Sequence, residues 1–357
     1  MKIPSAKPCL EEDDRQALNR VFDSGQIADG DEIARFESEL AAAVGVSDVV
    51  AVGSGFAALH LALASMGVGP GDEVILPCVS TCPAMRNAVW AAGAAPVFAD
   101  VNRADFNLSI EAVRAAATSR AKAIIAPHHT GIPADIPGLR ALGIPVVEDC
   151  AQAIGASREG QPAGSLGTAS VFSFYATKLM TSVDGGAVCS NQPALAARAR
   201  ELRYYRHRND QQMRFNYKMQ NLNAAVGRSQ LKKLPRFLDR RRSIARRFSD
   251  VFLAAGGRES QILHQAAGAV YFKWALRLAP SVRARLLDEA QKRDLPCSTE
   301  FHWVAEDSGP FPNARRLMER ILTVPVYPAL TDEEVRWMEA RLAESLAAVG
   351  AVGEGEA

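Results

Sequence analysis

Short apolar segments alternate with helical patterns through the first half of the chain, and this alternation constrains the fold more than any other feature. The apolar, β-type runs occupy residues 49–53, 73–77, 96–100, 122–127 and 145–149. Helical patterns lie between them, over about 56–66, through Ala88 and Val89, over 112–117, and in a short segment that ends near Leu142. Continuous apolar runs are typical of parallel strands that are covered on both faces. The sequence therefore predicts a doubly wound α/β domain, in which ligands bind beyond the carboxyl ends of the strands.

Small and polar residues occupy the carboxyl ends of these predicted strands. They are Gly53-Ser54-Gly55, Pro77, Asp100, His128-His129 and Asp149. Because the carboxyl ends of parallel strands meet at one edge of a sheet, we expect these residues to converge on one crevice. His128 and His129 are adjacent, so in an extended segment their side chains point opposite ways and cannot easily share a metal ion. At least one of them is expected to be structural.

A long helical region follows residue 188 and leads into a second domain. Its segments are 195–205, 221–234 and, after Pro235, the basic stretch 236–257. In that stretch Phe237, Ile244, Phe248 and Phe252 recur at helical spacing, so its arginines are interpreted as a solvated helix face rather than a surface for phosphate or nucleic acid. We place a large ligand-binding domain at residues 1–235, with an N-terminal helical segment. A smaller C-terminal α+β domain follows at 236–357, with a strand at 271–278.

The composition excludes several classes of protein. Of the 357 residues 48% are hydrophobic, and 41 Lys and Arg against 40 Asp and Glu give a net charge of +1, so no overall field favours nucleic acid or an acidic membrane. No signal peptide and no apolar run long enough to span a bilayer is evident. Six scattered cysteines argue for a reducing compartment, and we expect a cytoplasmic protein. Cys78 and Cys82 are interpreted as small buried residues rather than metal ligands, and no metal is expected.

Three motifs at strand ends carry the chemistry. In GSGFAALH (53–60), small residues let backbone N–H groups at a helix N-terminus approach an anion. In EDCAQAIGA (148–156), Asp149 is either a helix N-cap or a carboxylate that faces a protonated ring nitrogen of a cofactor. Lys178, in VFSFYATKLMTSVDGGAVCSN (171–191), is either a loop lysine that reaches solvent or an amine that forms a Schiff base. Together, a phosphate cradle, an acid and an amine are the three attachments that pyridoxal phosphate requires.

These blocks, in this order, resemble the DegT/DnrJ/StrS family of pyridoxal-phosphate aminotransferases, best known for aminating keto groups of nucleotide-linked sugars. The resemblance covers almost the whole chain, from the block at 36–77 through HHTGIPAD, VVEDCAQAIGA and SVFSFYATKLMTSVDGGAV to ILTVPVYPALTDEEV at 321–335. It implies the α/β fold of type I pyridoxal-phosphate transferases. In that fold a large doubly wound domain with a mostly parallel sheet binds the cofactor, and a smaller α+β domain follows.

The resemblance also implies a role for each matching residue. Lys178 would form the internal aldimine, Asp149 would pair with the pyridine nitrogen, and Gln152 would lie against the ring near its hydroxyl. The phosphate would be held by Ser54, Gly55, the backbone of Phe56, and Ser173. Asn216 is similar to an asparagine that reaches the phosphate bound by the neighbouring subunit. This implies a homodimer with shared active sites.

Four features depart from the family pattern. Phe56 stands where a threonine is usual, and residues 77–85 carry one extra residue and lack the large aromatic that normally covers the cofactor ring. The stretch 203–216 is short, and 298–304 does not match the usual His-Tyr pattern on the substrate side. The cofactor chemistry is therefore expected to be intact and the substrate pocket altered.

The resulting hypothesis is a ping-pong aminotransferase. Lys178 would hold the cofactor and move the proton, the donor would be L-glutamate or glutamine, and the acceptor would be a keto group of a nucleotide-linked sugar. Two alternatives stay open: an acceptor such as a keto-cyclitol or another specialised-metabolite ketone, and a non-catalytic sensor that kept the fold. A related group that removes hydroxyls has histidine in place of the lysine, so Lys178 argues against that chemistry.

Overall fold

The computed structural model describes residues 1–205, 210–263, 268–299, 301–305, 309–350 and 352. The helices in chain order are α1 (Glu12–Ser24), α2 (Asp31–Val44), α3 (Gly55–Ser65), α4 (Ala84–Ala91), α5 (Ile110–Ala116), α6 (Ile136–Arg140), α7 (Pro193–Leu202), α8 (Asn221–Ala254), α9 (Pro280–Lys292), α10 (Pro312–Met318) and α11 (Asp332–Val349). The strands are β1 (Asp48–Val52), β2 (Glu73–Pro77), β3 (Val79–Ser80), β4 (Ala95–Ala99), β5 (Ala121–Pro127), β6 (Val146–Asp149), β7 (Ser157–Arg158), β8 (Gln161–Pro162), β9 (Ala169–Ser173), β10 (Gly186–Ser190), β11 (Lys273–Arg277), β12 (His302–Trp303) and β13 (Ile321–Pro325). Short 3-10 turns lie at His129–Gly131 and Glu259–Gln261.

The central sheet is mostly parallel, as the sequence predicts. Its order is β1-β10-β9-β6-β5-β2-β4, in which β9, β6, β5, β2 and β4 are parallel and β10 and β1 extend one edge in antiparallel pairing. Each of the five predicted runs forms a strand whose ends lie within about one residue of the prediction. The predicted helices between them are α3, α4, α5 and α6. The fold class is therefore confirmed.

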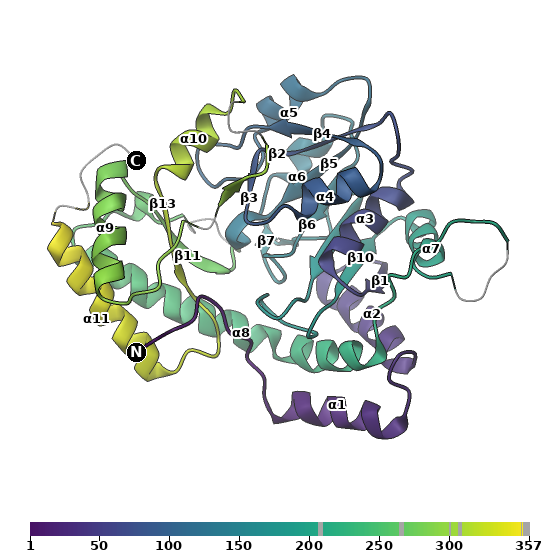
Figure 1. Cartoon of the computed structure of the whole chain (residues 1–357), viewed down its shortest axis with the longest axis horizontal. Coiled ribbons are helices and arrows are strands. Elements are labelled where there is room, and N and C mark those ends of the chain that lie inside the picture. The colour runs from purple at the N-terminus through teal and green to yellow at the C-terminus, as the bar shows by residue number, and fades with distance from the viewer. Residues whose placement is uncertain (206–209, 264–267, 300, 306–308, 351, 353–357) are drawn as a thin grey trace.

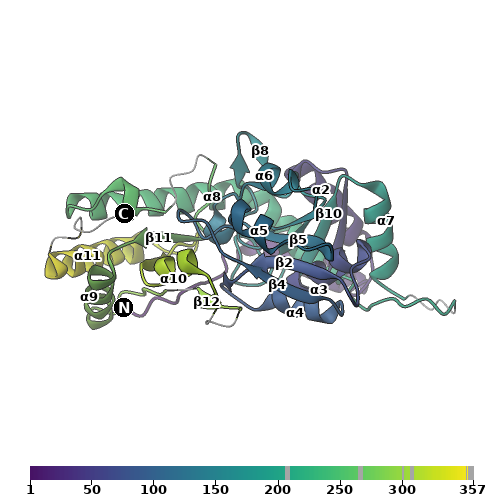
Figure 2. The same ribbon diagram turned by 90° about the horizontal axis from the view of Figure 1, so that it is seen from above.

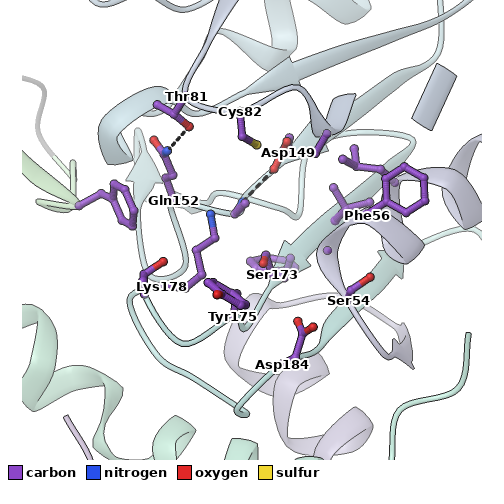
Figure 3. A pocket seen from close by; sticks show the side chains of 18 residues that line it. Ser54, Phe56, Thr81, Cys82, Asp149, Gln152, Ser173, Tyr175, Lys178 and Asp184 are labelled. Atoms are coloured by element: carbon purple, nitrogen blue, oxygen red, sulfur yellow. Dashed lines mark hydrogen bonds between the residues drawn. The ribbon is translucent and has the colours of Figure 1, made fainter. Parts of the chain in front are cut away.

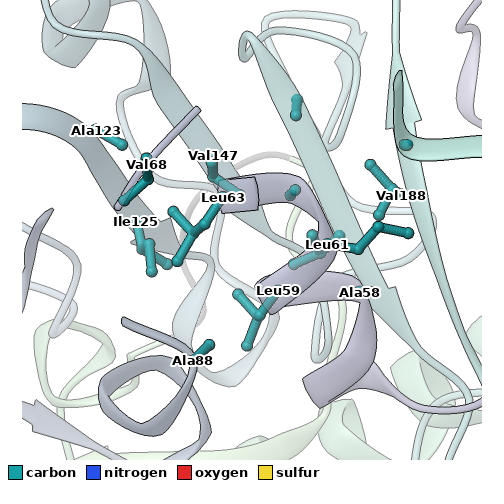
Figure 4. Close-up of a cluster of buried hydrophobic side chains, with 14 of the residues drawn as sticks. Ala58, Leu59, Leu61, Leu63, Val68, Ala88, Ala123, Ile125, Val147 and Val188 are labelled. Atoms are coloured by element: carbon teal, nitrogen blue, oxygen red, sulfur yellow. The ribbon is translucent and has the colours of Figure 1, made fainter. Parts of the chain in front are cut away.

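Helices cover both faces of this sheet, and the alternation along β1 shows how. Val50 and Val52 are fully buried in the cluster that α3, α4 and α7 build on one face (Figure 4). Val49 and Ala51 point to the opposite face, where α2 and the first half of α8 pack. Helix α3 is apolar on all sides because it lies between the sheet, α4 and α7. Its N-terminus is thereby held rigidly at the carboxyl edge of the sheet.

Helix α8 corrects one prediction. The sequence suggests separate helices before and after Pro235, but the helix runs from Asn221 to Ala254 with Pro235 inside it. An interior proline costs about 3 kcal/mol because it removes a hydrogen bond and crowds the preceding turn. Packing on both sides offsets this cost: Leu234 is buried against the large-domain core, and Phe248 against the C-terminal core.

The C-terminal part forms its own core beside the large sheet (Figures 1 and 2). It contains the antiparallel pair β11–β13, helices α9 and α11, and the second half of α8, where Phe237, Ile244, Phe248 and Phe252 are buried as predicted. The N-terminal segment reaches the same region, because Tyr327 donates a hydrogen bond to the Pro4 carbonyl at 3.1 Å. The boundary after residue 235 falls within α8, and the domain division stays a prediction. Among the described helices, none is long and apolar enough to cross a membrane.

Candidate active site

A cavity of about 470 Å³ opens at the carboxyl ends of the parallel strands, beside the N-terminus of α3. Seven of the eight site residues proposed from the sequence line it: Ser54, Gly55, Phe56, Asp149, Gln152, Ser173 and Lys178 (Figure 3). The eighth, Asn216, is exposed and does not line the cavity; its segment pairs with Tyr204. Segments separated by more than a hundred residues therefore meet at one site, as the topology of the strands predicts.

The N-terminus of α3 and the end of β9 form a cradle for an anion. The Ser54 side chain caps the helix by accepting the Ala57 N–H at 3.1 Å, while the N–H groups of Gly55 and Phe56 precede the first intrahelical bonds. A Cβ at Gly55 would lie only 2.7 Å from Ser173 Cβ, so only glycine lets the helix end approach β9 this closely. Free backbone donors, the positive helix end and two serine hydroxyls suit a phosphate group.

Asp149 ends strand β6 at the floor of the cavity. Its carboxylate accepts the Ala151 N–H at 3.0 Å, and a turn rather than a helix follows, so the N-cap interpretation is wrong. Loss of water around the carboxylate raises its pKa, although the Ala151 N–H and the Lys178 charge act in the opposite direction. A cationic group placed against Asp149 would restore the charged form.

Lys178 lies in the loop between β9 and β10 and is half-buried, so it is neither a fully solvated lysine nor an isolated buried charge. Its backbone N–H donates to the Tyr175 carbonyl at 2.9 Å, and the next residues, Leu179 and Met180, are buried and anchor the loop. Its Nζ projects into the cavity, 5.6 Å from the centre of the Phe272 ring (Figure 3). An amine thus faces an acid across a site that also holds an anion cradle.

Gln152 is buried and held at both ends of its amide. Its Oε1 accepts the Thr130 N–H at 2.8 Å. Its Nε2 donates to Thr81 Oγ1 at 2.8 Å (Figure 3). These two bonds fix which end of the amide faces each neighbour. Among the described residues, Nε2 donates only to Thr81, which leaves its second hydrogen for a ligand in the cavity.

Several cavity residues were not identified from the sequence. They are Thr81, Cys82, Tyr175, Thr177, Asp184 and Phe272. Tyr175, Thr177 and Asp184 lie near Lys178 in the sequence, and that proximity was a usable signal. Phe272 lies beyond α8 in the sequence and had no local signal. Cys82 was interpreted as buried, but it is exposed at the cavity, because it lies in the turn between β3 and α4; Cys78 is buried as expected.

Two of the unusual segments pair with each other beside the site and are here called the β3–β12 wall (residues 77–85 and the described residues of 298–304). Of this wall, Thr81, Cys82 and Ala84 line the cavity. Ser80 pairs with His302 and Val79 with Trp303, in antiparallel register. The Val304 N–H also donates to the Cys78 carbonyl at 2.9 Å. The wall therefore joins the large domain to the C-terminal part beside Thr81 and Cys82.

A second polar cluster, built on His128 and Glu148, lies at the ends of β5 and β6. His128 Nε2 donates to Glu148 at 3.0 Å, and its Nδ1 accepts the Ala134 N–H at 2.9 Å, which makes the ring neutral. Glu148 also accepts backbone N–H groups from the loop at Gly164 to Gly167. Burial opposes ionisation of Glu148, but His128 and these N–H groups outweigh it and lower the pKa. His128 is thus structural, and the two histidines face different partners.

An amine, an acid and a phosphate cradle around one cavity in this fold define a fold type I pyridoxal-phosphate enzyme, and the close approach of α3 to Ser173 fits the cofactor's phosphate. A family model described as the DegT/DnrJ/EryC1/StrS aminotransferase family matches residues 8–342. The chain belongs to this family, and it is a pyridoxal-phosphate-dependent aminotransferase.

Characterised relatives agree with this assignment. The chain is 31% identical to GDP-perosamine synthase of Vibrio cholerae, covering 94% of this chain and 96% of that protein. It is 33% identical to dTDP-3-amino-3,4,6-trideoxy-alpha-D-glucose transaminase of Micromonospora megalomicea subsp. nigra, covering 88% and 89%. Among solved structures, the aminotransferase TlmJ from Streptoalloteichus hindustanus superposes with a TM-score of 0.89 at 32% identity, covering 97% of this chain and 99% of that one.

Proposed function

We propose that the chain transfers an amino group from L-glutamate, or glutamine, to a keto group of a nucleotide-linked sugar by a ping-pong mechanism. The observation that carries the proposal is the convergence of seven expected residues on one cavity, with the Lys178 amine facing Asp149 across it. The names of two relatives, one acting on a GDP-linked and one on a dTDP-linked sugar, support the acceptor class.

Each residue of the cavity has a separate role in this proposal. When bound, pyridoxal phosphate supplies an aldehyde that takes up amino groups and a ring that stores electrons. The α3 cradle and Ser173 would bind its phosphate, and Asp149 would place a negative charge against the ring nitrogen. The Lys178 amine would accept the proton from the donor's α-carbon and later return a proton to the acceptor carbon. Gln152, fixed by Thr130 and Thr81, would orient the ring through its remaining amide hydrogen.

The kinetic test uses L-glutamate with keto sugars linked to GDP or dTDP. The expected products are 2-oxoglutarate and the amino sugar, detected by mass spectrometry, with parallel lines in double-reciprocal plots because the first product leaves before the acceptor binds. Intersecting lines would contradict the ping-pong order. Cofactor binding without turnover of any amino donor would favour the sensor instead.

The β3–β12 wall favours a second candidate acceptor. It lacks a large aromatic at Thr81 and Cys82, where the family resemblance leads us to expect one over the ring. A keto-cyclitol or another specialised-metabolite ketone is therefore the alternative. Turnover of a keto-cyclitol with no turnover of either nucleotide-linked sugar would select it.

We also propose a homodimer in which Asn216 completes the neighbouring subunit's phosphate site. Asn216 is exposed and lies outside the cavity of its own chain, which supports a role in another subunit's site. Lys178→Ala and Asn216→Ala chains, each impaired alone, should regain activity when refolded together, because one site of each hybrid dimer then carries neither change. A monomer in light scattering, or no recovery on mixing, would contradict the shared site.

A further inference from the structure

A small second cavity of about 30 Å³ adjoins the main one on the side of β5 and β3. It shares Thr81, Cys82, Asp149, Ala151, Gln152 and Lys178 with the main cavity, and its remaining wall is Ser80, Met85, Pro127, His128 and His129. One water needs roughly 10–15 Å³ of such space and two to four polar partners. The cavity therefore has room for a water molecule directly behind the expected cofactor site.

His129 brings an unusual group to this cavity. Its side chain is buried, and its Nε2 has no hydrogen-bond partner among the described residues. The ring packs edge-on against Phe301 at 5.1 Å, and Phe301 stacks on Phe106 at 4.0 Å, so the ring is held in place. A buried nitrogen without a partner is destabilising, so such a group in a folded protein usually has a polar partner.

The protonation state of His129 makes that nitrogen an acceptor. Burial lowers the pKa of the imidazole to about 3, although the backbone of Val79 opposes the shift. The ring is therefore neutral at ordinary pH, and the Val79 carbonyl favours the hydrogen on Nδ1. Nε2 then carries a lone pair, which needs a donor.

Two other groups of the cavity match a water. Thr81 Oγ1 accepts from Gln152, and its own hydroxyl hydrogen has no acceptor in the described part of the chain. Asp149 uses one lone pair for the Ala151 N–H, and an ionised carboxylate offers about four. A donor (Thr81) and two acceptors (His129 and Asp149) thus line a space of one water.

We propose that this cavity binds one ordered water, which accepts from Thr81, donates to His129 Nε2 and donates to Asp149. His129 then acts as a positioning residue: it fixes the water that favours the ionised form of Asp149, which burial disfavours. The consequence for the cofactor rests on the proposed role of Asp149, whereas the water site itself does not.

The first test is a high-resolution crystal structure of the cofactor-free protein. The expected result is density for one water within hydrogen-bond distance of His129 Nε2 and Asp149, and its loss in His129→Leu, which removes the acceptor. A wild-type structure without that water, or with a water that does not contact His129, overturns the proposal. Because this readout needs no cofactor, it stands even if the proposed function fails, and the wild-type protein suffices if the variant does not fold.

The second test measures the dissociation constant of pyridoxal phosphate against pH. Affinity should fall at low pH as Asp149 is protonated. In His129→Leu the ionised carboxylate of Asp149 loses a hydrogen bond, so the pKa of Asp149 rises. The loss of affinity should therefore begin about one pH unit higher, and binding in that pH range should be about tenfold weaker than in wild type. His129→Gln, whose amide oxygen can accept from the water, should stay within about threefold of wild type. If the pH dependence of affinity shifts equally in both variants, the effect of His129 is one of packing and the proposal is overturned. An unchanged pH dependence in His129→Leu also overturns it.

Discussion

The floor and one side of the active-site cavity differ in how closely they follow the family pattern. The floor (Ser54, Gly55, Asp149, Ser173 and Lys178) consists of strand ends, a helix N-terminus and the loop that carries Lys178, and these are residues that the sequence resemblance predicts to bind the cofactor. The β3–β12 wall contains two segments that the sequence predicts to depart from the family pattern, and these segments pair with each other. This contrast predicts that chemistry and selectivity are carried by separate parts: the sheet fixes the floor, while the wall can change without moving it.

The largest expected effect concerns the floor. Lys178→Ala removes the amine that attaches the cofactor and moves the proton, so glutamate-dependent turnover should fall by at least about 10³-fold. Lys122→Ala, at an exposed position of β5, is the matched control and should behave as wild type. Steady-state production of 2-oxoglutarate is the measurement. Retention of a tenth of the activity would remove Lys178 from the mechanism.

Asp149→Asn should lower turnover but raise the stability of the cofactor-free protein at high pH. Turnover should fall by about 10²-fold because the ring nitrogen loses its counter-charge. The folded-state pKa of Asp149 is raised, so in the cofactor-free protein its contribution to stability is present below the ordinary pKa of aspartate and is lost as pH rises through the raised pKa. The variant should therefore raise the melting temperature of the cofactor-free protein at pH 8 but not at pH 4, with Asp250→Asn as control. A lower melting temperature at pH 8 would be inconsistent with this account.

Thr81→Val tests the hydrogen bond that joins Thr81 of the wall to Gln152. The substitution keeps the side-chain shape but leaves the buried Gln152 amide without its acceptor, at a cost of about 1–3 kcal/mol. We expect turnover to drop about tenfold, and Thr81→Ser, which keeps the hydroxyl, to recover most of it. Turnover and thermal unfolding of both variants decide the matter, and equal losses would mean that the methyl group rather than the hydroxyl is needed.

Cys82→Phe is expected to have the smallest effect. Cys82 is exposed at the cavity, so a larger ring fits without repacking the core. If it covers the cofactor ring, an aromatic contact worth about 0.5–1.5 kcal/mol should tighten cofactor binding three- to tenfold. The ratio of activities toward different keto acceptors should change more than the affinity for glutamate. An unchanged acceptor preference would show that the wall does not set selectivity.

The sequence predicts local features well and long-range ones poorly. Strands β1, β2, β4, β5 and β6 were placed within about a residue because they are continuously apolar, and the meeting of Asp149 with Lys178 follows from the topology. Helix α8 runs through Pro235 because packing outweighs local propensity, which no local pattern signals. The pairing of Ser80 with His302 joins residues more than two hundred positions apart, so the exposure of Cys82 could not be inferred from its neighbours.

The most direct test of the central claim is to find which residue carries the cofactor. The purified protein with pyridoxal phosphate is reduced with borohydride, digested, and its peptides are analysed by mass spectrometry. The account predicts that the pyridoxyl mass lies on Lys178, and that L-glutamate added before reduction removes it. Label on another lysine, or label on Lys178 that no amino donor removes, would contradict an aminotransferase whose chemistry depends on this amine.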